Sequence, residues 1–107
     1  MTQANASDTT PAEYSYSKDP GNNRYVVHYD DEIVGFASYR ELADGVHFDH
    51  TVVDQAHQGT GVASKLVRFA LDDFERTSKL ALIPDCSYVD AWLKRHPDYQ
   101  HLTEARA

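Results

Sequence analysis

The sequence predicts a small mixed α/β domain, in which a mostly antiparallel, twisted sheet is followed by a glycine loop, a crossover helix and a parallel strand. Two patterns support this fold class. Apolar and polar residues alternate between Val46 and Val53, which is the period of a β-strand. Apolar residues then recur at helical spacing from Ala63 to Phe74, directly after a loop that contains two glycines. A crossover helix requires the next strand to return parallel to the strand before the loop.

The chain before the glycine loop is expected to form antiparallel hairpins. Residues 1–13 are rich in Thr, Ser, Ala, Asn and Gln and lack apolar periodicity, so we expect a disordered leader before a single domain over residues 14–107. Strands are predicted over residues 14–18, 24–29, 32–40 and 46–53. The turns between them are predicted at Pro20-Gly21-Asn22-Asn23, Asp30-Asp31 and Asp44-Gly45.

The chain after the crossover helix is predicted to form one more strand and one more helix. Residues 79–83 read as the returning strand, which Pro84 ends. Ser87 and Asp90 have the spacing of a capping box, so a second helix should begin there and present an apolar stripe of Val89, Trp92 and Leu93. The pair His96-Pro97 should stop that helix.

The loop Gln58-Gly59-Thr60-Gly61-Val62-Ala63 is a candidate anion cradle. The start of a helix leaves backbone N–H groups unpaired at the positive end of the helix dipole, and glycines let a phosphate approach them closely. A tight strand-to-helix turn without a ligand remains the alternative. A P-loop is excluded because no Lys-Ser or Lys-Thr follows the glycines. A dinucleotide-binding fold is disfavoured because Ser64 stands at its third glycine position and only one strand-helix-strand unit is present.

The composition excludes several classes of partner. Seventeen acidic and ten basic residues give a formal net charge of −7, whereas a nucleic-acid-binding protein needs a basic face. An acidic protein attracts cationic acceptors, although many proteins are acidic for solubility alone. The single cysteine, Cys86, excludes an intrachain disulfide, and no apolar run reaches the roughly 20 residues of a membrane-spanning helix. Residues 1–13 lack a signal-peptide pattern, so we expect a cytoplasmic protein without a membrane partner.

The pattern Gln58-x-x-Gly61-x-Ala63 resembles the Gln/Arg-x-x-Gly-x-Gly/Ala signature of the GNAT superfamily of N-acetyltransferases. Residues 48–53 before the loop, and residues 84–88 and 96–99 after it, resemble the compact single-domain members of that superfamily. The resemblance extends from about Tyr14 to Leu102. It implies a GNAT-like fold and an enzyme that transfers the acetyl group of acetyl-CoA to an amine.

The resemblance also implies which residues bind acetyl-CoA. The backbone groups of Thr51, Val52 and Val53 would hold the pantetheine arm in a gap between two splayed strands. The pyrophosphate would be wrapped by Gln58, Gly59, Thr60, Gly61, Val62 and Ala63. Lys65 and Arg68 in the following turns could add positive charge, although a solvated helix face is the more ordinary role for both.

Three residues are candidates for the chemistry. Cys86 follows a strand end at the start of a helix, where the helix dipole favours a thiolate; a small buried hydrophobe is the alternative. By the resemblance, Cys86 either accepts the acetyl group transiently or lines the pocket while the amine attacks directly. Tyr88 is the candidate acid for the leaving thiolate, or a tyrosine that packs at a helix start. His50 is the candidate base, or a core histidine, since strict alternation places it on one strand face with Val46, Phe48 and Val52.

Other functions remain open at the level of sequence. His47 and Asp49 share a predicted strand face near His57, but nothing supplies a further ligand, so we expect no metal. A CoA or acyl-CoA binding module without turnover is one alternative to an enzyme. A protein-interaction domain with Tyr88, Trp92 and Tyr99 as an aromatic contact patch is another. The acceptor amine could belong to a small molecule or a protein, and the protein is expected to be a monomer or a weak dimer.

Overall fold

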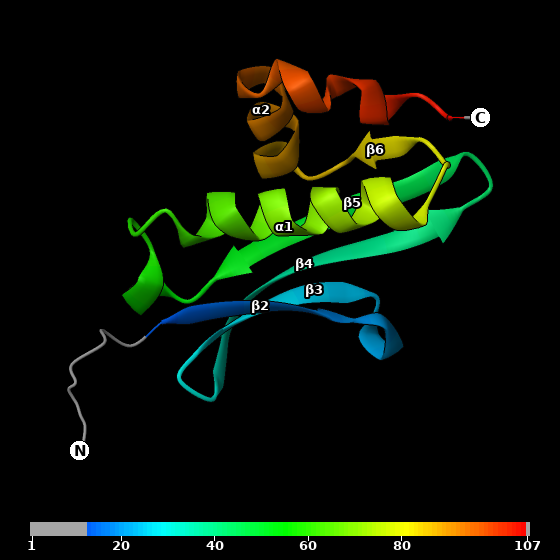
Figure 1. Ribbon diagram of the computed structural model, residues 1–107. Helices are drawn as coiled ribbons and strands as arrows, with labels where there is room; N and C mark the ends of the chain where they lie inside the picture. Colours follow the sequence, from blue (N-terminus) through cyan, green and yellow to red (C-terminus); the bar gives the residue numbers. More distant parts are fainter. Residues whose placement is uncertain (1–12, 107) are drawn as a thin grey trace.

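The computed structural model describes residues 13–106, and within them the chain forms one five-stranded sheet (Figure 1). The strands lie in chain order: β2 (Tyr14–Asp19), β3 (Arg24–Tyr29), β4 (Glu32–Leu42), β5 (Gly45–Val53) and β6 (Leu82–Pro84). The first four pair antiparallel, and β6 pairs parallel to β5. The predicted fold class, with its antiparallel meander and parallel return, is confirmed. The predicted leader falls almost wholly outside the described residues.

Two α-helices of the described chain pack on one face of this sheet. Helix α1 (Val62–Thr77) lies across β2 to β5, and α2 (Ser87–Arg95) packs beside it against β5 and β6 (Figure 1). Short 3-10 segments occur at η1 (Pro20–Asn22), η2 (Gln55–His57) and η3 (Pro97–Thr103). Helix α2 ends at Arg95, as the His96-Pro97 pair predicts. No helix in residues 13–106 is long and apolar enough to cross a membrane.

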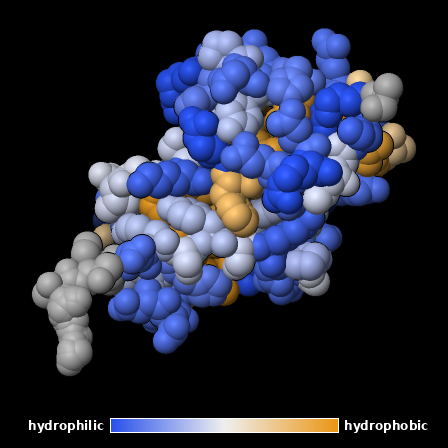
Figure 2. Space-filling view, viewed as in Figure 1, coloured by the Kyte–Doolittle hydropathy of each residue, from blue (hydrophilic) through white to orange (hydrophobic). Residues whose placement is uncertain are grey.

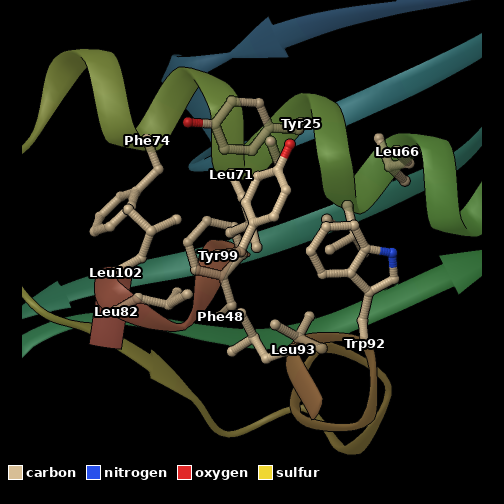
Figure 3. Close-up of a cluster of buried hydrophobic side chains, with 14 of the residues drawn as sticks. Tyr25, Phe48, Leu66, Leu71, Phe74, Leu82, Trp92, Leu93, Tyr99 and Leu102 are labelled. Carbon is tan, nitrogen blue, oxygen red and sulfur yellow. The ribbon is translucent and has the colours of Figure 1, made fainter. Parts of the chain in front are cut away.

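The hydrophobic core fills the space between the sheet and the helices (Figure 3). Helix α1 buries one apolar stripe: Val62, Leu66, Val67, Ala70, Leu71 and Phe74. Trp92 of α2 is fully buried, and its indole N–H donates to the Ser64 hydroxyl of α1 at 2.8 Å. This hydrogen bond satisfies the one polar group of the indole inside an apolar environment. The core therefore fixes α2 to α1, and with it the position of residues at the start of α2.

Strand β6 is shorter than predicted. It begins at Leu82 rather than at residue 79. Leu82 is opposite Val46, and β5 begins at Gly45, so residues 79 and 80 have no partner on β5. The carbonyl of Lys79 instead accepts from the Arg106 N–H at 2.7 Å, and the carbonyl of Ser78 accepts from the Arg106 guanidinium at 2.6 Å. Pro84 is the last residue of the strand, as predicted.

The predicted capping box at the start of α2 does not form. Cys86, not Ser87, is the N-cap residue, and no side chain caps the helix. The Asp90 carboxylate instead pairs with Lys94 one turn later, at 3.2 Å. The sequence therefore predicted the helix correctly but placed its N-cap one residue too late. The N-cap position belongs to Cys86.

A β-bulge interrupts the alternation of β5. Ser38 of β4 is opposite His50, whereas Tyr39 is opposite Phe48, so Asp49 is an extra residue on β5. Before the bulge, Phe48 faces the core and is 1% exposed. After it, Thr51 and Val53 are half-buried, while His50 is exposed and Val52 is 46% exposed. The prediction that His50 shares a face with Val46 and Phe48 is wrong, because the bulge reverses the alternation.

Candidate functional site

A gap opens between β5 and β6. The two strands pair only at Val46–Leu82, His47–Ile83 and Phe48–Pro84. The N–H of Cys86 then donates to the carbonyl of Phe48 at 2.9 Å, and the chain turns into α2. Strand β5 continues to Val53 without a strand beside this edge. The backbone of residues 49–53 therefore borders an opening that leads toward the start of α1.

The glycine loop closes one end of this opening. Gly59 and Gly61 have φ angles of +80° and +82°, in the left-handed region that L side chains rarely adopt. A Cβ added to either glycine meets no heavy atom within 4 Å, so both face open space. Gly61 is the N-cap of α1, which has no side-chain cap and no acidic residue in its first turn. Within residues 13–106, the N–H groups of Gly59, Gly61, Ala63 and Ser64 donate to no protein acceptor. The arrangement suits an anion.

A cavity of about 280 Å³ lies against this loop. Most of the residues predicted to bind acetyl-CoA line it, and so does Tyr88, one of the residues predicted for the chemistry. The full lining is Val53, His57, Gln58, Gly59, Gly61, Val62, Ala63 and Tyr88. The Gln58 amide donates to the carbonyl of Val53 at 3.1 Å, which ties the loop to the end of β5. From the sequence alone, His57 is considered only as part of a metal site. Its position directly before Gln58 was the signal that could have placed it at the cavity.

Two predicted residues support the loop and the gap rather than line the cavity. The Thr60 hydroxyl donates to the carbonyl of His57 at 2.7 Å and thereby braces the glycine turn. The Cys86 thiol donates to the Thr51 hydroxyl, with 3.5 Å between sulfur and oxygen. Cys86 is half-buried and packs against the core. The structure therefore brings Cys86 and Thr51 together across the β5–β6 gap, while Tyr88, two residues after Cys86, lines the cavity.

Three other sequence candidates lie away from the cavity. His50 is exposed on the opposite face of the sheet, so the interpretation as a core histidine is wrong; its role as a base stays a prediction. Lys65 is exposed on α1. Arg68 is held between the rings of Trp92 and Tyr99, each 5.4 Å from its guanidinium carbon, and donates to the Tyr99 hydroxyl at 3.1 Å. Arg68 therefore links α1 to α2 and η3.

A second hollow, of about 190 Å³, lies at the other end of α1 and contains none of the predicted site residues. Two of its lining residues are already paired. Lys18 lies 3.0 Å from the Asp73 carboxylate, and the Tyr25 hydroxyl donates to the same carboxylate at 2.8 Å. Burial and this hydrogen bond raise the pKa of Tyr25, so the phenol is a fixed donor there.

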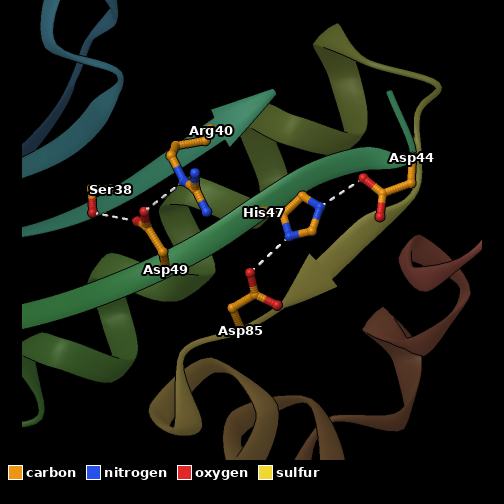
Figure 4. A network of polar contacts seen from close by, with 6 residues as sticks. All are labelled: Ser38, Arg40, Asp44, His47, Asp49 and Asp85. Carbon is orange, nitrogen blue, oxygen red and sulfur yellow. Dashed lines mark hydrogen bonds and ion pairs between the residues drawn. The ribbon is translucent and has the colours of Figure 1, made fainter. Parts of the chain in front are cut away.

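Polar contacts hold the start of β5 to the segment before Cys86 (Figure 4). The His47 imidazole lies between two carboxylates, with 2.7 Å to Asp44 and 2.7 Å to Asp85. The hydrogen bond to Asp44, and to a smaller extent the hydrogen bond to Asp85, raise the pKa of His47 above its ordinary value. Asp49 on the bulge accepts from Ser38 at 2.7 Å and pairs with Arg40 at 3.3 Å. Residues 13–106 contain no group of three or more His, Cys, Asp or Glu suited to a metal ion.

The His47 network predicts a pH dependence of stability. A histidine whose pKa is raised on folding contributes stability that is complete below its unfolded pKa and is lost as the pH rises through the raised value. The hydrogen bond to His47 lowers the pKa of Asp44, so the same contact is also lost in acid. Urea unfolding of the protein and of His47→Gln should therefore differ most near about pH 6, within the ordinary range of histidine, and converge toward about pH 9. A difference in the free energy of unfolding that stays constant over this pH range would show that the contacts of His47 do not raise its pKa in the folded protein.

Two comparisons with known proteins agree with this geometry. A family model described as GCN5-related N-acetyl-transferase matches residues 24–102. Among solved structures, the chain is similar to the ribosomal-protein-alanine N-acetyltransferase from Brucella melitensis biovar Abortus 2308, with a TM-score of 0.52 and 20% sequence identity. The match covers 78% of this chain and 59% of that chain, so the present chain spans less than two thirds of its structural neighbour. No curated protein matches the chain.

Proposed function

The chain belongs to the family of GCN5-related N-acetyltransferases, and from this premise we propose that it binds acetyl-CoA beside the glycine loop and transfers the acetyl group to an amine. One observation carries the proposal. The uncapped N-terminus of α1, with both glycines facing open space, lines one cavity with Val53 at the end of β5 and with Tyr88. A diphosphate at the loop and a thioester beside Tyr88 could thus occupy one continuous site.

The residues present fit acetyl-CoA chemically. Unpaired N–H groups and the positive end of the α1 dipole favour phosphate oxygens, and no acidic side chain in the first turn opposes them. The backbone of Thr51, Val52 and Val53 runs along the open edge of β5, where it can pair with the amide groups of a pantetheine arm. The cosubstrate supplies an acetyl thioester, whose carbonyl carbon is the electrophile. The chain supplies the position of that carbonyl between β5 and the start of α2.

Cys86 and Tyr88 are assigned to the transfer itself. In direct transfer, the amine nitrogen attacks the thioester carbonyl, the carbon–sulfur bond breaks, and the amine proton passes to a base or water. The Tyr88 phenol, which lines the cavity, would protonate the leaving thiolate. In the alternative, the Cys86 thiolate first attacks the carbonyl and the CoA thiolate leaves; the amine then attacks the acetyl-cysteine, whose carbon–sulfur bond breaks to return the Cys86 thiolate. His50 remains a candidate base only if the amine approaches from the uncovered face of the sheet.

An amine acceptor agrees with the charge of the chain. The net charge is −7, and hydrophilic side chains cover most of the face shown in Figure 2. A protonated amine is attracted by such a surface before it loses its proton. The structural neighbour is named for a ribosomal-protein alanine, so peptides with an N-terminal alanine belong in the acceptor screen beside lysine peptides and small amines. We further propose that the protein acts in the cytoplasm as a monomer or a weak dimer.

Release of free CoA from acetyl-CoA, measured with and without each amine, tests the proposed function. We expect release only when an acceptor is present. Tyr88→Phe should slow it by about 100-fold or more without weakening binding, because a general acid commonly contributes a factor of this order. Tyr16→Phe, on a half-buried tyrosine that does not line the cavity, should leave the rate unchanged. Binding without release for any amine would favour a CoA-binding module.

Cys86→Ala separates the two routes of transfer. If the acetyl group passes through the sulfur, the variant should lose turnover, and mass spectrometry of the unchanged protein after incubation with acetyl-CoA alone should find acetyl on Cys86. If the amine attacks directly, Cys86→Ala should retain most of the activity, and no acetylated Cys86 should accumulate. A variant that fails to bind acetyl-CoA would instead make Cys86 a pocket residue, since the side chain lies 3.5 Å from Thr51 on β5.

A further inference from the structure

His57 occupies a defined position at the cavity that the assignments above leave unused. It is the last residue of η2 and directly precedes the Gln58 that begins the glycine loop. Its half-buried side chain lines the cavity together with Gly59 and Gly61. The imidazole therefore borders the same space as the unpaired N–H groups at the start of α1.

Two aromatic residues from the first part of the sheet fix the His57 ring. The Tyr14 hydroxyl of β2 lies 2.9 Å from His57 Nδ1. The Tyr29 ring of β3 lies 4.8 Å from the imidazole centroid, and the Tyr14 ring meets it edge-on at 5.6 Å. The hydrogen bond joins residues 43 positions apart in the chain, and the ring contacts help to hold the imidazole in one orientation.

The contact with Tyr14 also determines which ring nitrogen is available to a ligand. A phenol is a good donor, and the Tyr14 hydroxyl has no other acceptor within residues 13–106. When Tyr14 donates to Nδ1, the neutral imidazole carries its proton on Nε2. Nε2 has no hydrogen-bond partner in the described chain. His57 thus has one fixed nitrogen and one free N–H donor.

From this geometry we infer that His57 is a phosphate-binding residue, which donates its Nε2–H to an oxygen of the diphosphate, and that Tyr14 is its positioning residue. The inference rests on the proposed function, because it assigns the ligand group that the loop would hold. A phosphate is the matching acceptor: it carries negative charge, it suits the α1 N-terminus, and a donor to an ionised acceptor forms a strong hydrogen bond. Among the described residues, the lining of the cavity contains no Lys or Arg that could replace this donor.

Isothermal titration of the full chain with CoA and with acetylpantetheine, which lacks the diphosphate, tests this role. His57→Phe keeps an aromatic ring and removes both nitrogens. It should weaken CoA by about tenfold or more, since hydrogen bonds to charged groups have this strength, and leave acetylpantetheine unchanged. His57→Gln, whose amide retains a donor, should lose less than His57→Phe. Tyr14→Phe should also weaken CoA alone, by a smaller factor. His28→Phe, on a histidine outside the cavity, is the matched control.

The ¹⁵N spectrum of the imidazole provides a readout that a merely structural role would not move. The Nε2 resonance of His57 should shift with CoA and remain in place with acetylpantetheine, whereas His28 should respond to neither. Equal losses for both ligands in His57→Phe, or no loss for CoA, would overturn the inference while the proposed function stands. No binding of CoA by the unchanged protein would overturn both.

Discussion

Gly61→Asn is expected to lower the affinity for acetyl-CoA by about 100-fold or more, because its side chain would enter the space that the diphosphate needs and would compete for the helix N–H groups. Gly61 has a φ of +82°, and a Cβ there points into open space. Asparagine tolerates the left-handed region better than other L residues, so the fold should survive the change. The measurement is isothermal titration with acetyl-CoA, combined with thermal unfolding of the variant without ligand.

Gly21→Asn is the matched control for this prediction. Gly21 is also exposed and has open space around its Cβ, but it lies in η1 and has no left-handed φ. The control should bind acetyl-CoA like the unchanged protein. A Gly61→Asn variant that folds and keeps its full affinity would show that the glycine loop only turns the chain.

Trp92→Ala is expected to reduce the free energy of unfolding by about 3–5 kcal/mol, the usual cost of removing a fully buried aromatic side chain. Trp92 is 0% exposed and contacts α1 through Ser64 and η3 through Tyr99. Its ring stacks on His96 with centroids 3.8 Å apart and meets the Tyr99 ring edge-on at 4.9 Å. Because small domains have only about 5–15 kcal/mol of stability, this loss should leave a large unfolded fraction on mild heating. Urea unfolding followed by circular dichroism measures it.

Two further variants show which part of the Trp92 effect comes from packing. Ser64→Ala removes only the acceptor of the indole N–H and should cost about 1–3 kcal/mol, the penalty of an unsatisfied buried donor. Leu80→Ala, at a side chain 39% exposed, should change stability by less than about 0.5 kcal/mol. If Trp92→Ala cost no more than Leu80→Ala, the core described above would not hold α2 in place.

Local patterns were sufficient to predict the order of the elements. Strand patterns located β3, β4 and β5, and the apolar stripe from Ala63 to Phe74 located α1, which extends one residue before it and three residues beyond it. The parallel pairing of β6 followed from the crossover helix, because the handedness and reach of such a connection leave few alternatives. The predicted cofactor-binding residues of the loop lie around one cavity because they are close in the chain: the end of β5, the glycine loop and the start of α1 follow one another.

Long-range contacts account for what the sequence did not reveal. The bulge at Asp49 depends on pairing with Ser38 and Tyr39 of β4, so alternation within β5 alone placed His50 on the wrong face. The short length of β6 depends on its register with β5, which begins only at Gly45. The pair formed by Tyr14 and His57 depends on β2 returning to the loop from the other side of the sheet. None of these contacts leaves a periodic signal in one segment.

Thermal unfolding of the full chain with acetyl-CoA, CoA and ATP tests the central claim most directly. A ligand that binds only the folded state at about 100 times its dissociation constant adds near 2.7 kcal/mol of stability, which shifts the midpoint of a domain this size by several degrees. We expect a shift with both CoA forms, none with ATP, and none in folded Gly61→Asn. No shift of the unchanged protein at millimolar acetyl-CoA would contradict the proposal that this loop holds the cosubstrate of an acetyltransferase.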